Sequence, residues 1–185
     1  ETGTQEMLDF LQKKATLEQA VNASRWTREA GIISRGSFML GLPNETPEIA
    51  EKTIDFAIEL DPDYANFNIF FPEPGTGLYE LAVKSGKLLS DEYLGRSVPV
   101  YLPDGYENAD QIRALQGKAF RKFYFRPSYM MKRIMRIRSW TEIQQYFDGA
   151  AMLLSMNKTK SNKIKPRFAF STETSKTGTD ARNVF

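Results

Sequence analysis

The sequence predicts an α/β fold, in which short buried strands alternate with amphipathic helices. The apolar run at residues 38–42 is too short for a globular helix and is followed at once by glycine and proline. Thr46 can cap a following helix, and Pro47 suits the first position of that helix. A second strand pattern begins about 30 residues after the first, as expected of one βαβ unit. Its two strands should be parallel and joined by a right-handed crossover.

The composition bounds the class of protein. The chain has 185 residues, 41% hydrophobic and 26% charged, which suits one soluble domain or part of a larger one. The net charge of +2 gives no reason to expect a nucleic acid or an anionic membrane as partner. No apolar run approaches the roughly 20 residues of a membrane span, and no segment resembles a signal peptide. We therefore expect a cytoplasmic protein.

Two residue types are missing from the whole sequence, cysteine and histidine. Without cysteine the chain can form neither a disulfide nor a thiolate metal site, and we expect it to hold no metal. Without histidine it lacks the usual general base. An enzyme of this composition must use carboxylates, lysines or tyrosines, borrow a cofactor or be incomplete. The first residue is Glu1 rather than Met, which suggests that the chain begins inside a domain.

Periodicity and capping signals place the elements of the first half. Residues 4–13 should form a short helix, and residues 16–30 a second helix that opens with a capping box and ends at Gly31. The helix that begins at Pro47 should end at residues 61–63. A strand at residues 64–71 should place alternate side chains on one face, namely Ala65, Phe67, Ile69 and Phe71.

The second half is predicted to be mainly helical. Helices are expected at residues 78–84, 110–125, 128–138 and 139–156, with loops and one short edge segment at residues 98–102 between the first two. Basic and apolar residues at 130–140 favour the solvated face of a packed helix over a membrane surface. Three parts follow: an α/β part at residues 1–89, a helical part at 90–156, and a disordered tail at 157–185.

Three strand ends should meet at one edge of a parallel sheet, where α/β enzymes bind their ligands. They are residues 1–4, 41–45 and 71–76, and each carries a carboxylate and a glycine. Glycine lets a flat ligand approach the backbone closely. Each glutamate, taken alone, can equally be a charge that stabilises a helix N-terminus.

At these residues the chain resembles the radical S-adenosylmethionine (SAM) enzymes. Residues 1–9 with 13–16 are similar to the end of the fourth strand and the next helix of that family, and residues 36–46 to the fifth strand. Residues 64–79 are similar to the sixth strand, with a Pro-Gly-Thr turn common in the branch that carries a cobalamin-binding domain. Residues 120–127 resemble the C-terminal extension of that branch. The resemblance covers residues 1 to about 155.

The resemblance implies the C-terminal half of a (β/α)6 partial TIM barrel, followed by an α-helical extension. In the family, a three-cysteine motif holds a [4Fe-4S] cluster that binds SAM. Reductive cleavage of SAM gives a 5′-deoxyadenosyl radical. Members of the cobalamin (B12) branch use this chemistry for methyl transfer, cyclisation or rearrangement at unactivated carbons.

The resemblance also implies roles for individual residues. The end of the fourth strand, which contacts the ribose or methionyl part of SAM, corresponds to Glu1 and Thr2. The adenine-binding fifth strand corresponds to Met39, Gly41, Leu42 and Pro43, and the sixth to Phe70, Phe71 and Pro72. Glu45 matches the glutamate of the fifth-strand motif and should orient the turn. The substrate side corresponds to Glu73, Gly75 and Thr76. The strict form of the fifth-strand motif is glycine-x-isoleucine-x-glycine-x-x-glutamate. In this chain Ser37 stands at the position of the first glycine, and Glu45 comes one residue later than the glutamate of the motif.

The absence of cysteine separates this chain from a complete enzyme of that family. We expect a C-terminal fragment whose partners are the N-terminal half of the same polypeptide, a small-molecule substrate and a reductant protein for the cluster. SAM would be its ligand, whereas the cluster and cobalamin would belong to the full-length enzyme. The isolated chain should be inactive. Two alternatives are a non-catalytic interaction or scaffold module, and an unrelated α/β-barrel enzyme using Glu1, Glu45 and Glu73.

Overall fold

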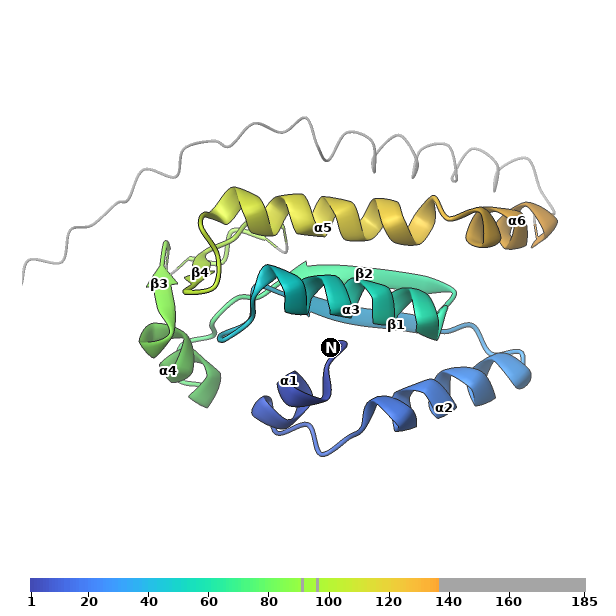
Figure 1. Cartoon of the computed structure of the whole chain (residues 1–185), viewed down its shortest axis with the longest axis horizontal. Coiled ribbons are helices and arrows are strands. Elements are labelled where there is room, and N and C mark those ends of the chain that lie inside the picture. The colour runs from blue at the N-terminus through green and yellow to red at the C-terminus, as the bar shows by residue number, and fades with distance from the viewer. Residues whose placement is uncertain (91, 96, 137–185) are drawn as a thin grey trace, which may run out of the picture.

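The computed structural model describes residues 1–90, 92–95 and 97–136 of the chain (Figure 1). At its centre lies a pair of strands, β1 (Arg35–Leu40) and β2 (Tyr64–Ile69), connected by helix α3 (Pro47–Leu60). The strands are parallel, with Arg35 opposite Tyr64 and Leu40 opposite Ile69. This confirms the predicted βαβ unit and the α/β class.

Local capping explains where the helices begin and end. The Thr46 hydroxyl accepts a hydrogen bond from the Ile49 backbone N–H at 3.4 Å, and α3 starts with Pro47 as predicted. Helix α2 (Leu17–Glu29) has the predicted capping box at Thr16, and Gly31 follows it with a φ of +70°. Helix α1 (Gln5–Phe10) is shorter than the prediction.

One core covers one face of the β1–β2 pair. Helices α3 and α5 (Ala109–Tyr124) both pack there, and Figure 1 shows α5 running along the sheet. The buried residues come from both strands and from both helices: Phe38, Leu40, Ala50, Ile54, Ala57, Ala65, Phe67, Ile112, Ala119 and Phe123. Residues on both sides of position 89 therefore contribute to this core, and a second, smaller cluster holds Met7, Leu42, Phe70, Ala82 and Tyr101.

Side chains of α5 close the outer edge of β2. The Tyr124 hydroxyl donates to the Ala65 carbonyl at 2.8 Å and accepts from the Ala65 N–H at 3.0 Å. The buried Gln116 side chain donates to the Phe67 carbonyl at 2.7 Å. These groups take the positions that a neighbouring strand would use, so they satisfy backbone groups that an open edge would expose.

The outer edge of β1 is met by the first residues of the chain. The Met39 N–H donates to the Glu1 carbonyl at 2.8 Å. Thr2 is 1% exposed, and its hydroxyl lies 3.2 Å from that of Thr53 in α3, which also accepts from the Gly3 N–H. Within the described residues no third strand continues along this edge.

A small antiparallel pair corrects the prediction for residues 85–103. Helix α4 (Gly77–Lys84) has its C-cap at Ser85, and Gly86 begins strand β3 (Gly86–Leu88). Strand β3 pairs with β4 (Tyr101–Pro103), with Leu88 opposite Tyr101. A side chain at Gly86 would collide with the Leu102 carbonyl and the Tyr101 ring, which explains the glycine. The predicted edge segment at residues 98–102 thus overlaps β4, but its partner strand was missed.

Helix α6 (Pro127–Arg136) is the last element described. The predicted helix at residues 139–156, the last two residues of the predicted helix at 128–138 and the predicted disordered tail lie outside the described residues. In the part of the chain that is described, no helix is long and apolar enough to cross a membrane.

Candidate functional site

A cavity of about 780 Å³ lies at the carboxyl ends of β1 and β2. It is bordered by the loop after α1, by the strand ends and by the start of α4. Seven residues that the sequence assigned to a ligand site line it: Glu1, Met39, Leu42, Phe70, Phe71, Glu73 and Thr76. All three predicted strand ends thus contribute to one cavity, as the parallel arrangement requires.

The cavity wall combines apolar and polar groups. Met39 is half-buried, and Leu42 and Phe70 are buried beside it. Ser37 and Asn68 project from the face of the strand pair opposite the core, and the Asn68 amide donates to the Ser37 hydroxyl at 3.3 Å. A mainly apolar cavity with a few polar groups is the usual form of a small-molecule site.

The charged border of the cavity is a surface ion pair. Lys13, in the loop after α1, lies with its Nζ 2.8 Å from the Glu1 carboxylate. Both side chains are about 40% exposed (42% and 40%), so the pair contributes little to stability but sets a charged rim at this edge.

Six predicted site residues do not line this cavity, and Glu45 is the sixth, described below. The Thr2 hydroxyl faces Thr53 in α3. Pro43 and Pro72 are buried, and Gly75, with a φ of +83°, has open space where a side chain would be. Gly41 has a φ of +76°, and a Cβ there would lie 3.3 Å from an Ile112 methyl group. Gly41 and Pro43 therefore shape the turn that carries Leu42.

Glu45 stabilises this turn through a hydrogen bond to its buried side chain. Its side chain is 0% exposed, and its Oε1 atom accepts from the Gly41 N–H at 2.5 Å and from the Tyr106 hydroxyl at 2.6 Å. The second oxygen, Oε2, is buried without a hydrogen-bond partner among the described residues. Burial raises the pKa of Glu45 to about 7, against the opposite effect of the hydrogen bonds from Tyr106 and the backbone of Gly41 and Leu42. Glu45 thus bonds to the backbone of the turn and does not line the cavity.

Sequence reasoning missed Tyr106 as part of this arrangement. Tyr106 lies 61 residues after Glu45, in the segment between β4 and α5. A Cβ added to the neighbouring Gly105 would lie 2.7 Å from the Glu45 carbonyl, so the two segments are in close backbone contact. No short-range motif signals such a pair. The sequence offers one hint, the acidic residue Glu45 in the turn that follows the buried strand.

Aromatic contacts join the cavity to the second sheet. Phe70 packs edge-on against Tyr101 of β4, with ring centroids 5.7 Å apart. Phe71 packs edge-on against Tyr93, with centroids 5.2 Å apart. Such pairs stabilise by about 0.5–1.5 kcal/mol beyond the area they bury. The segment around β4 therefore supports the end of β2 that faces the cavity.

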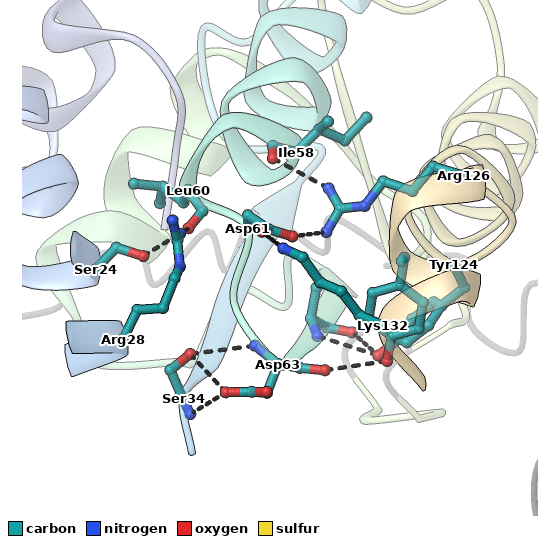
Figure 2. Close-up of polar contacts among 12 residues, drawn as sticks. Ser24, Arg28, Ser34, Ile58, Leu60, Asp61, Asp63, Tyr124, Arg126 and Lys132 are labelled. Carbon is teal, nitrogen blue, oxygen red and sulfur yellow. Dashed lines mark hydrogen bonds and ion pairs between the residues drawn. The ribbon is translucent and has the colours of Figure 1, made fainter. Parts of the chain in front are cut away.

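A second cavity, of about 630 Å³, lies at the opposite ends of the two strands, by the loop before β2 (Figure 2). Cations that line this cavity or lie beside it are bonded to other groups of the protein. Arg126 donates to the Ile58 carbonyl at 3.0 Å and pairs with Asp61, which also pairs with Lys132. Arg28 donates to the Leu60 carbonyl at 2.8 Å. These contacts hold α2 and α6 against the end of α3. The charged residues at this cavity therefore have a structural role.

The sequence of this chain is similar to the sequences of several known proteins. Over 135 residues, 72% of this chain and 29% of the relative, the chain is 36% identical to an uncharacterized methyltransferase of Pyrococcus horikoshii. It is also similar to two anaerobic magnesium-protoporphyrin IX monomethyl ester cyclases. The identity is 26% over 70% of this chain for the enzyme of Rubrivivax gelatinosus, and 28% over 68% for that of Cereibacter sphaeroides. The chain belongs to the radical SAM family.

These relatives are longer than this chain, which spans 29%, 23% and 20% of their respective lengths. No protein-family profile matches the chain. The names of these relatives are those of enzymes, a methyltransferase and two cyclases.

The [4Fe-4S] cluster of the radical SAM family does not fit the residues of this chain. Thiolates bind such clusters, and the sequence has no cysteine. Among the described residues no three acidic side chains lie together as a possible metal site. The apolar and polar lining of the first cavity, in contrast, fits the adenosyl part of SAM.

Proposed function

We propose that this chain forms one side of the SAM site in a radical SAM enzyme, as the second half of a partial (β/α)6 barrel. The observation that carries the proposal is the single cavity that Glu1, Met39, Leu42 and Phe70 share at the carboxyl ends of the strands. These residues come from three separate strand ends of the sequence, and the resemblance assigned all of them to SAM.

The chemistry of the cavity suggests how the ligand would lie. Met39, Leu42 and Phe70 offer an apolar surface for a flat adenine ring. The Glu1 carboxylate, beside Lys13, can accept hydrogen bonds from ribose hydroxyls. Glu73 and Thr76 stand at the rim, where a substrate would meet the ligand. The chain's own contribution is therefore binding and orientation.

The reaction proposed is methyl transfer, cyclisation or rearrangement at an unactivated carbon, in an enzyme that also uses cobalamin. The names of the relatives, a methyltransferase and two cyclases, support methyl transfer and cyclisation as the reactions. When bound to its cluster, SAM supplies the radical for such chemistry. The cluster would be held by polypeptide other than the residues present here.

An enzyme based on three carboxylates is a weaker proposal. It requires Glu1, Glu45 and Glu73 to face one site. Glu45 is fully buried and bonded to Tyr106 and the Gly41 backbone, while Glu1 and Glu73 line the cavity. The other alternative is a scaffold module, which would bind no ligand. The binding experiment described next separates this alternative from the leading proposal.

The experiment is calorimetric titration of the purified 185-residue chain with S-adenosylhomocysteine, which carries the adenosyl group of SAM. We expect saturable binding, weakened about 10-fold or more by Met39→Glu, because a charge would have to be buried against the adenine ring. Met131→Glu is the matched control, since Met131 is 59% exposed on α6. Absence of binding to the native chain, or equal loss in both variants, would contradict the proposal.

The nucleotide sequence upstream of Glu1 tests the proposal that this chain is part of a longer radical SAM enzyme. The reading frame upstream of Glu1 should encode three cysteines with three and then two intervening residues. A start codon directly before Glu1 would favour the scaffold alternative, and an upstream domain without the cysteine triplet would favour the carboxylate enzyme.

A further inference from the structure

Tyr106 connects the segment before α5 with the turn at the end of β1. Its ring is 5% exposed, and its hydroxyl donates to Glu45 Oε1 at 2.6 Å. The same oxygen accepts from the Gly41 N–H at 2.5 Å. One carboxylate oxygen therefore receives two donors, one from the turn and one from a residue 61 positions later in the chain.

The shape of the turn depends on this carboxylate. Gly41 has a φ of +76°, and Glu45 also donates its backbone N–H to the Leu42 carbonyl at 3.0 Å. The turn directs Leu42 to the cavity, while Ile112 of α5 packs beneath Gly41. Gly105 adds a close backbone contact on the other side of Glu45. The segment from Gly105 to Ile112 thus packs against the turn and supports its conformation.

We propose that Tyr106 is a positioning residue for the adenosyl site, acting through Glu45 on the turn that carries Leu42. This inference rests on the proposed function, and it assigns part of the ligand site to residues beyond the barrel strands. Tyr106 touches no ligand. Its hydroxyl keeps the Glu45 carboxyl in the orientation that holds the Gly41 N–H.

The electrostatic environment of the pair supports this role. Burial raises the pKa of Glu45 to about 7, and burial together with the Glu45 charge raises that of Tyr106. Glu48 and Glu51 of α3 add further negative charge near Tyr106. The hydroxyl therefore stays protonated and remains a donor whether or not Glu45 is ionised.

The test compares Tyr106→Phe with the native chain in two measurements. The first is the affinity for S-adenosylhomocysteine, which we expect to fall about 3- to 10-fold, because one charge-assisted hydrogen bond behind the turn is lost. The second is the NMR signal of the Gly41 amide. In the native chain it should shift with pH around a midpoint of about 7, the pKa of Glu45. In Tyr106→Phe this midpoint should move upward, because the charged carboxylate loses a donor.

Two variants separate positioning from general stability. Tyr129→Phe removes a hydroxyl that donates to the Asp63 carbonyl at 3.0 Å, at the other end of the strands, and should leave both measurements unchanged. Glu45→Gln keeps an oxygen that can accept from Gly41 and Tyr106, so it should retain affinity better than Glu45→Ala and abolish the pH midpoint.

The outcomes also distinguish this inference from the proposed function. If the native chain binds S-adenosylhomocysteine and Tyr106→Phe binds it equally well, the positioning role is refuted and the site is not. If the native chain does not bind it, the site is refuted. The Gly41 signal then tests only whether Tyr106 acts through Glu45 on the turn, and an unchanged midpoint in Tyr106→Phe overturns that coupling.

Discussion

Replacement of Glu45 by glutamine should remove a pH dependence of stability that the buried carboxyl creates. Burial raises the pKa of Glu45 from 4.5 to about 7, because the charged form loses its hydration. The folded state therefore holds this proton more tightly than the unfolded chain. The stabilisation is fully present below about pH 4.5 and is lost as the pH rises to about 7.

The size of the effect follows from the two pKa values. The gap between 4.5 and about 7 corresponds to about 3 kcal/mol in the free energy of unfolding. Other carboxylates also titrate in this range, but their contribution is common to the native chain and to Glu45→Gln. The quantity to measure is therefore the difference between the two proteins at about pH 4.5 and at about pH 8.

Urea unfolding followed by circular dichroism at both pH values gives this difference. We expect the native chain to lose about 3 kcal/mol relative to Glu45→Gln between the lower and the higher pH. The glutamine amide places two N–H donors at the Oε2 position, where the described residues offer no partner, but this cost is the same at both pH values. Parallel pH profiles for the two proteins, or a native chain that gains relative stability at high pH, would refute the reasoning.

Two further predictions concern the closed edge of β2 and the turn after β1. Tyr124→Phe should lower the free energy of unfolding by about 1–3 kcal/mol, because the Ala65 N–H and carbonyl lose their shared partner. Tyr93→Phe, at a 58% exposed ring, is the control and should cost little in the same urea unfolding measurement. Gly41→Ala should cost about 1–2 kcal/mol for its positive φ, and more than Gly75→Ala, because only at Gly41 would the new methyl group meet Ile112. Equal costs at the two glycines, measured by thermal unfolding, would show that the Ile112 contact adds nothing.

Local chemistry made the first half of the fold predictable. The N-cap Thr46 and the first helical residue Pro47 mark the start of α3. The alternation of Ala65, Phe67 and Ile69 identifies the buried face of β2. These signals act over a few residues, so they can be read directly. The three strand ends could also be grouped, because the carboxyl ends of parallel strands meet at one edge.

The remaining features depend on contacts between distant segments. Residues 86–88 are too few to show a strand period, so the pairing of β3 with β4 has no local signal. The partner of Glu45 lies in a segment that reads as loop, and Gln116 reads as an ordinary polar position on α5. Thr2 was placed at the ligand site from its neighbour Glu1, but successive side chains alternate in direction, and its hydroxyl faces α3.

The closure of one edge of the β1–β2 pair limits how copies of this chain could associate through it. An open-ended fibre built by strand addition needs two different free edges on each copy, so that each one accepts a neighbour and offers itself to the next. The hydroxyl of Tyr124 and the amide of Gln116 occupy one of these edges. Pairing through this sheet could then use only the part of the β1 edge that lies outside the bond between the Met39 N–H and the Glu1 carbonyl, and such a contact stops at two.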